Sequence, residues 1–180
     1  MNRKIIFLLI GQKGSGKSFI GSLMNQHFNI KFLRVEDWVK NIKKDRSIHD
    51  KSYLIDAFHA IEIGVRQQLN NFQIVTFEST GLTEYFDQML NSLKMDFKVV
   101  TILVKADSNI CLHRVKNRDA VIHINISDEQ VININKKFLE KNFKADFQID
   151  NNDKTKKELL LELQKILIST APNFGLMQKL

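Results

Sequence analysis

The sequence predicts an α/β protein with three layers, α/β/α, in which helices cover both faces of a five-stranded parallel sheet. Short apolar runs alternate with stretches of helical spacing along the whole chain, and this alternation is typical of βαβ units. The apolar runs contain few polar residues, which is the composition of strands that are buried on both faces.

Each element follows from a local pattern. The predicted strands are the apolar runs at residues 4–10, 31–35, 72–77, 97–104 and 147–149. Helical spacing predicts helices over residues 17–28, 38 to about 70, 85–93, 108–117, 127 to about 142 and 154–168. In the longest of these stretches, one apolar face carries Leu54, Phe58, Ile61, Val65 and Leu69. Ser127 and Gln130 match a capping box at a helix start.

Length and composition limit the class of protein. The 180 residues fit one domain over residues 1–180. The net charge of +7 comes mostly from 21 lysines spread along the chain, so charge alone does not favour a nucleic-acid partner, although it does not exclude one. The run Ile5–Ile10 is too short for a membrane span, and the single Cys111 excludes an internal disulfide. We expect a protein of the reducing cytoplasm with no membrane partner.

One motif points to a ligand. Residues 11–18, GQKGSGKS, match the phosphate-binding loop (P-loop) pattern G-x-x-x-x-G-K-[ST] between a predicted strand and a predicted helix. Glycines let the backbone approach an anion closely, so that successive N–H groups form a nest for phosphate. The predicted nucleotide-binding residues of the loop are Gly11, Gly14, Ser15, Gly16, Lys17 and Ser18. Lys17 should reach the β- and γ-phosphates of ATP or a similar nucleoside triphosphate, and the Ser18 hydroxyl should bind Mg²⁺.

Two arginines follow the fourth predicted strand on one helix face, Arg114 and Arg118. Together with the P-loop, this pattern resembles the small P-loop kinases of the nucleoside-monophosphate-kinase-like group, which includes adenylate, shikimate and gluconate kinases. The resemblance implies a sheet order of 2-3-1-4-5 and a short lid over residues 118–127. It also implies that Arg114 packs on the base and Arg118 reaches the phosphates, tasks that suit a planar guanidinium. The alternative is a solvated basic helix end.

Two further segments carry the resemblance. Glu78 ends the third predicted strand, at the edge of a parallel sheet where ligands bind, and the resemblance implies that it binds Mg²⁺ or accepts a proton. Asn151 lies in the loop after the last predicted strand, and in related kinases the backbone of this loop lies against the base. The alternatives are that Glu78 only starts a turn and that the loop only caps the next helix.

The acceptor side carries fewer signals. In the resembling kinases, the helical stretch that here spans 37–71 lies on the side of the phosphate acceptor. Glu36 or Asp37 could orient an acceptor hydroxyl as a general base, or could cap the following helix. Arg66 could bind an anionic acceptor, or could pair with Glu62 four residues earlier.

The acceptor motifs of the named kinases are missing. Residues 79–81 are Ser-Thr-Gly, where a shikimate kinase has three glycines. We therefore expect an ATP-dependent, Mg²⁺-dependent phosphotransferase that acts on a small-molecule or nucleotide acceptor of unspecified identity. A kinase of polynucleotide ends and a non-catalytic or hydrolytic ATP-binding switch are the alternatives.

Overall fold

The computed structural model of the protein describes residues 3–43, 45–47, 50–117 and 127–172. Its strands are β1 (Ile5–Ile10), β2 (Lys31–Leu33), β3 (Ile74–Ser79), β4 (Lys98–Lys105) and β5 (Phe147–Asp150). Its helices are α1 (Lys17–Phe28), α2 (Val35–Lys43), α3 (Lys51–Asn71), α4 (Glu84–Asp96), α5 (Ser108–Lys116), α6 (Asp128–Glu140) and α7 (Lys156–Thr170). Arg118 and all of the predicted lid except Ser127 lie outside the described residues.

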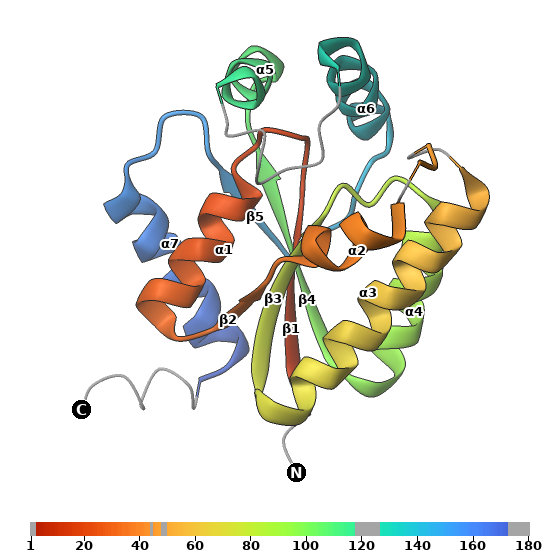
Figure 1. Cartoon of the computed structure of the whole chain (residues 1–180). Coiled ribbons are helices and arrows are strands. Elements are labelled where there is room, and N and C mark those ends of the chain that lie inside the picture. The colour runs from red at the N-terminus through yellow and green to blue at the C-terminus, as the bar shows by residue number, and fades with distance from the viewer. Residues whose placement is uncertain (1–2, 44, 48–49, 118–126, 173–180) are drawn as a thin grey trace.

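The strands form one parallel sheet in the predicted order, β2-β3-β1-β4-β5. The central strand β1 is buried along its whole length, and its side chains alternate between the two faces of the sheet. Ile6, Leu8 and Ile10 join the core on one face, and Ile5, Phe7 and Leu9 join the core on the other. Because all strands run in the same direction, their carboxyl ends meet at one edge, which is the upper edge in Figure 1.

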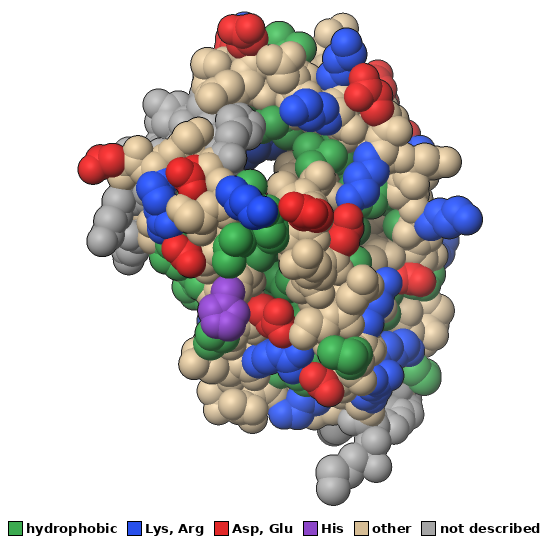
Figure 2. All heavy atoms as spheres, turned by 90° about the vertical axis from the view of Figure 1, so that its right-hand side faces the viewer, with side chains coloured by type: hydrophobic (Ala, Val, Ile, Leu, Met, Phe, Trp, Pro, Cys, Tyr) green, Lys and Arg blue, Asp and Glu red, His purple; other side chains and the backbone are tan. Residues whose placement is uncertain are grey.

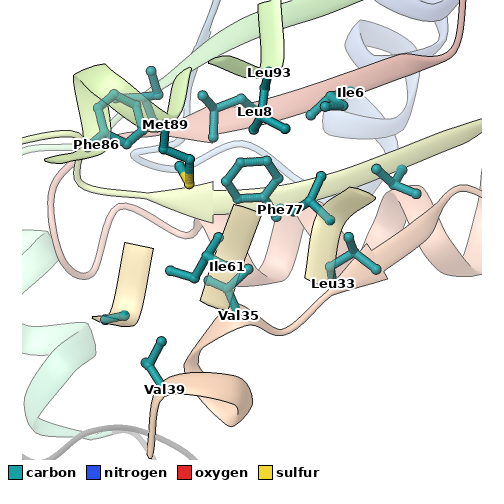
Figure 3. Close-up of a cluster of buried hydrophobic side chains, with 14 of the residues drawn as sticks. Ile6, Leu8, Leu33, Val35, Val39, Ile61, Phe77, Phe86, Met89 and Leu93 are labelled. Carbon is teal, nitrogen blue, oxygen red and sulfur yellow. The ribbon is translucent and has the colours of Figure 1, made fainter. Parts of the chain in front are cut away.

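Helices cover both faces of the sheet (Figure 1). α3 and α4 lie on one face, where Ile61 and Leu93 pack in one core with Phe77 of β3 (Figure 3). α1 and α7 lie on the other face and bury Leu23 and Leu163. α5 and α6 lie beyond the carboxyl ends of the strands. The three predicted layers are therefore present, and two helices stand over the edge where a ligand of a parallel sheet binds.

The predicted helical stretch after β2 consists of two helices. α2 begins earlier than expected, at Val35, with Glu36 and Asp37 in its first turn, where carboxylates favour a helix start. α3 begins after Asp50, whose side chain accepts a hydrogen bond from the Tyr53 N–H. The two helices pack closely, because a Cβ atom on Gly64 of α3 would lie only 2.6 Å from the Trp38 ring of α2. Both helices add side chains to the core on the α3 face of the sheet.

Capping fixes the start of two later helices. The predicted box at Ser127 and Gln130 is present at the start of α6. A second box, formed by Thr155 and Glu158, starts α7 two residues later than the sequence pattern indicated. None of the helices within the described residues combines the length and the apolar composition that a membrane span requires.

Candidate active site

The P-loop joins β1 to α1 at the carboxyl edge of the sheet. Gly14 and Gly16 adopt positive φ angles of 87° and 96°, a region that other residues rarely enter. A Cβ atom on Gly14 would lie 2.1 Å from the carbonyl oxygen of Cys111, and one on Gly16 would lie 2.1 Å from Asn151 Nδ2. These glycines therefore permit both the turn and its close packing against α5 and the loop after β5.

Lys17 is buried at the start of α1, with 6% of its surface exposed. Its ammonium group donates hydrogen bonds to the carbonyl oxygens of Gly11 and Gln12 at 2.9 and 2.8 Å. The pKa of Lys17 is lowered to about 8, mainly by burial; the negative charge of Glu78 opposes this shift, and the positive charge of Lys13 contributes to it. A bound anion would therefore stabilise the charged ammonium form of Lys17.

Ser18 and Glu78 meet across the site. The register between β1 and β3 places Glu78 opposite Leu9, one residue from the end of β1, and the Ser18 hydroxyl donates a 2.6 Å hydrogen bond to Glu78 Oε1. Both groups present oxygen ligands, which Mg²⁺ prefers. The described residues contain no cluster of three or more His, Cys, Asp or Glu side chains that could hold a metal ion alone. The donor set therefore fits a Mg²⁺ ion that takes its other ligands from phosphates and water.

Arg114 and Asn151 connect α5 to the P-loop. Arg114 donates hydrogen bonds from Nη1 to the carbonyl oxygen of Asn151 and from Nη2 to that of Asn152, at 2.9 and 3.0 Å. Asn151 is buried, and its Nδ2 donates to the carbonyl oxygen of Ser15 at 2.7 Å. The hydroxyl of Ser15, also buried, has no hydrogen-bond partner among the described residues. Arg114 thus braces the loop that in turn holds the P-loop.

Sequence reasoning did not identify Asn135 on α6. Its Oδ1 accepts a hydrogen bond from the Lys13 N–H at 2.8 Å, and its Nδ2 donates to the Lys13 carbonyl oxygen at 3.0 Å. The side chain is buried on the α6 face that also carries Val131 and Phe138. A mid-helix asparagine at helical spacing from apolar residues was the available signal, because this residue type disfavours helix interiors unless its amide has a partner.

The three residues proposed for the acceptor side lie in different places. Glu36 lines the cavity described below and is half-buried. Asp37 is half exposed and forms ion pairs with Arg34 at 3.5 Å and Lys40 at 4.0 Å. Arg66 lies toward the opposite edge of the sheet, because it pairs with Asp96 just before the amino end of β4.

Arg66 binds partners of its own. It pairs with Glu62 at 2.9 Å and with Asp96 at 2.7 Å, and Asp96 ends α4 just before β4 begins. Neither Asp37 nor Arg66 is among the residues that line the cavity. The structure brings Glu36, but neither of the other two, to the P-loop.

A cavity of about 480 Å³ connects these groups. Its donor end is lined by Lys13, Gly14, Gly16, Lys17, Ser18 and Arg114. Glu36, Glu78 and Thr80 also line it, and side chains of α2 and α3 form a wall around the part that we call its second compartment. The molecule is hollowed in its upper part when viewed from the side of α3 and α4 (Figure 2). One cavity therefore extends from the phosphate-binding loop to a second compartment.

No family model matches this sequence, and no curated protein matches it either. Solved structures do match. A gluconokinase from Sinorhizobium meliloti 1021 has a TM-score of 0.67 at 15% identity, with 99% of each chain covered. A shikimate kinase from Aquifex aeolicus has a TM-score of 0.59 at 21% identity, covering 93% of this chain and 98% of that one. A deoxyadenosine kinase from M. mycoides, solved with bound dCTP, has a TM-score of 0.57 at 17% identity and covers 89% and 98%.

The chain has the fold of the small P-loop kinases. The match extends over nearly the whole length of these chains, and the sheet order and element sequence agree with the expectation from the resemblance. At these identities the likeness concerns the fold, so the function has to be inferred from the site itself.

Proposed function

We propose that the protein is a kinase that transfers the γ-phosphoryl group of Mg-ATP to a small molecule held against α2, α3 and the end of β3. The observation that carries this proposal is the single cavity that joins the P-loop to a second compartment past Glu36 and Glu78. A protein that only binds or hydrolyses ATP has no need of a compartment next to the γ-phosphate position. The solved structures of similar fold include small-molecule and nucleoside kinases by name, which supports the proposal.

The donor residues act by position and charge. The N–H groups at the start of α1 have no partner within the helix, so they are free to bind the β-phosphate. Lys17 is proposed to move from the loop carbonyls to the phosphate oxygens, where its positive charge balances the charge that shifts to the leaving group. Ser18 and Glu78 would hold Mg²⁺, which neutralises phosphate charge when bound.

Glu36 is the proposed base on the acceptor side. It lines the cavity next to the second compartment, whose wall is formed by α2 and α3. In the transfer, an acceptor oxygen forms a bond to the γ-phosphorus while the bond from that phosphorus to the bridging oxygen breaks. ADP leaves, and the proton of the acceptor hydroxyl passes to the Glu36 carboxylate.

The test is a search for phosphorylated product. The full chain is incubated with Mg-ATP and pools of small alcohols, and ADP release and product mass are measured with and without Mg²⁺. We expect acceptor-dependent ADP release that needs Mg²⁺ and is lost in Lys17→Ala. ATP binding with ADP release that no acceptor stimulates would contradict the proposal and favour the hydrolytic switch.

A further inference from the structure

The second compartment of the cavity has an apolar wall. α2 and α3 contribute Val39, Tyr53, Leu54, Ala57, Phe58 and Ile61 to it, and the loop after β3 contributes Leu82. The α3 residues recur at the spacing of one helix face. Leu54 and Phe58 are only partly buried because they face the cavity. Residues further along the same helix face are buried because the sheet covers them.

Charge is distributed unevenly along the cavity. Among the described lining residues, the cations are Lys13, Lys17, Arg114 and Lys137. Lys13 and Lys17 belong to the P-loop, and Arg114 is bound to the loop carbonyls beside it. Lys137 stands on α6, and its side chain is exposed. No cation on α2 or α3 lines the cavity among these residues.

The described arginines of α3 and of the segment before it are paired with carboxylates, although the Arg46 guanidinium also lies 5.7 Å from the ring of Tyr53, which lines the cavity. Arg46 pairs with Asp56 at 2.8 Å and donates to the carbonyl oxygen of Ile42. Arg66 pairs with Glu62 and Asp96. A carboxylate or phosphate placed against the wall of α2 and α3 would therefore find no cation on these two helices among the described residues that line the cavity, and the burial of a charge that is not fully paired is strongly unfavourable.

The polar groups of this compartment are gathered at its junction with the donor end. Glu36, Ser79, Thr80 and Thr83 line the cavity there. Tyr53 is buried in the same region, and both burial and the negative charge of Glu36 raise the pKa of its phenol. Tyr53 therefore keeps its proton and can donate a hydrogen bond. One hydroxyl of a bound molecule can be recognised at this junction while the rest of the molecule contacts apolar side chains.

We infer that the acceptor is an uncharged alcohol with an apolar body, an aromatic or aliphatic ring, and that it is neither a hydroxy acid nor a phosphate ester. The hydroxyl points to Glu36, and the ring lies against Leu54, Phe58 and Ile61. This inference rests on the proposed function only for the transfer step. Binding of such a molecule in the compartment is independent of any transfer.

Matched ligand pairs test the inference. Each pair differs by one carboxylate: para-methylbenzyl alcohol against para-(hydroxymethyl)benzoate, and a cyclohexyl methanol against its para-carboxylate. Binding to the full chain is followed by ligand-observed NMR in the presence of saturating Mg²⁺ and a non-hydrolysable ATP analogue, so that the donor end is filled. We expect the neutral member of each pair to bind at least tenfold more tightly than the acid.

Leu54→Arg provides the matched variant, because Leu54 is partly buried and a long side chain there reaches the cavity. It should weaken neutral ligands at least tenfold and favour the acids, with unchanged stabilisation by Mg-ATP. Ile55→Arg on the exposed side of the same helix is the control and should change neither ligand class. If Leu54→Arg does not fold, Leu54→Ser should still weaken neutral ligands.

Two outcomes would overturn the inference. One is tighter binding of the acids by the unmodified protein; loss of that binding in Lys137→Met would then identify Lys137 as the anchor of an anionic acceptor. The other is an equal response of Leu54→Arg and Ile55→Arg. Binding of neutral alcohols without their phosphorylation would instead contradict the proposed kinase activity, while the inference that the cavity binds uncharged alcohols would still hold.

Discussion

The two ends of the cavity are built by different means. At the donor end, the P-loop backbone is held by hydrogen bonds from Asn135 and Asn151, residues that lie 122 and 136 positions away from their partners. At the acceptor end, side chains of α2 and α3 form an apolar wall. Phosphate recognition tolerates few residue types, and it therefore leaves a motif. An apolar wall can be made from many residue combinations, and it therefore leaves none.

Removing Lys17 should have the largest effect on the donor end. Lys17→Ala should lower turnover by about 10²–10³-fold, because a positioned cation is lost from the transferring phosphate. At a hundredfold excess over Kd, Mg-ATP should stabilise the unmodified protein by about 2.7 kcal/mol, or about 5–10 °C in Tm, and the variant far less. Thermal melts and ADP release measure both. Lys105→Ala, at an exposed lysine on the same edge of the sheet, should behave like the unmodified protein.

Glu78→Gln tests whether the carboxylate beside Ser18 takes part in transfer. Glutamine keeps the acceptor oxygen for the Ser18 hydroxyl but removes the charge that a Mg²⁺ ion requires. Turnover should fall tenfold or more, about 1.4 kcal/mol in activation free energy, with an unchanged Tm. Glu84→Gln, exposed in the first turn of α4, is the control. A fully active Glu78→Gln enzyme would reduce Glu78 to a residue that starts a turn.

The pH dependence of nucleotide binding should report the burial of Lys17. Its pKa of about 8 means that the free protein loses this proton above pH 8, whereas phosphates bind the ammonium form. Affinity for Mg-ATP should therefore fall by up to about tenfold per pH unit above pH 8, with proton uptake on binding. Calorimetry in buffers of different ionisation enthalpy measures that uptake, and Lys17→Met should abolish it.

The stability of the free protein should depend on the same residue with the opposite sign: above pH 8 the Lys17 contribution to stability rises, whereas the affinity for Mg-ATP falls. Between about pH 8 and the ordinary lysine value of 10.5, the unfolded chain holds a proton on Lys17 that the folded chain lacks. The contribution of Lys17 to the free energy of unfolding therefore rises with pH across this window. Comparison of denaturation of the unmodified protein with that of Lys17→Met isolates this contribution.

Asn135→Ala should give the smallest effect and the sharpest contrast between the two ends. Loss of two hydrogen bonds to Lys13 should raise the KM for ATP about fivefold, on the order of 1 kcal/mol. The KM for the acceptor should stay unchanged, because the hydrogen bonds described for Asn135 are to Lys13 of the P-loop and none is to α2 or α3. Asn133→Ala, exposed on the same helix, is the control. A parallel rise in both KM values would indicate a general loss of structure.

Local patterns were sufficient to predict the sheet and the P-loop. The strands are apolar runs of the right length, and the loop motif lies between the first strand and the first helix, so all of its information is contiguous. The resemblance supplied the sheet order, which the structure confirms. Arg66 could be assigned to either of two environments from spacing alone, and the structure shows the pairing with Glu62.

Periodicity could not separate a core from a cavity. Leu54, Phe58, Ile61, Val65 and Leu69 share one helix face. Val65 and Leu69 are almost completely buried, whereas Leu54 and Phe58 line the cavity. The difference lies in what the neighbouring elements cover, and an amphipathic pattern carries no such information. Asn135 was not predicted for the same reason, because its hydrogen-bond partner is the backbone of Lys13, 122 residues away in the sequence.

The attachment of the P-loop to elements in the second half of the chain has a consequence for biosynthesis. The motif emerges from the ribosome among the first residues, but the central strand pairs with β3 and β4, and the loop is gripped by α5, α6 and Asn151. Contacts this distant in sequence form late, because the intervening chain must first be closed into loops. A nascent chain that ends before Asn151 contains the whole P-loop motif but lacks the hydrogen bond from Asn151 to Ser15 that helps to hold the loop. Under the proposed function, nucleotide should therefore stabilise the P-loop only after the carboxyl-terminal segments have been made and have docked onto it.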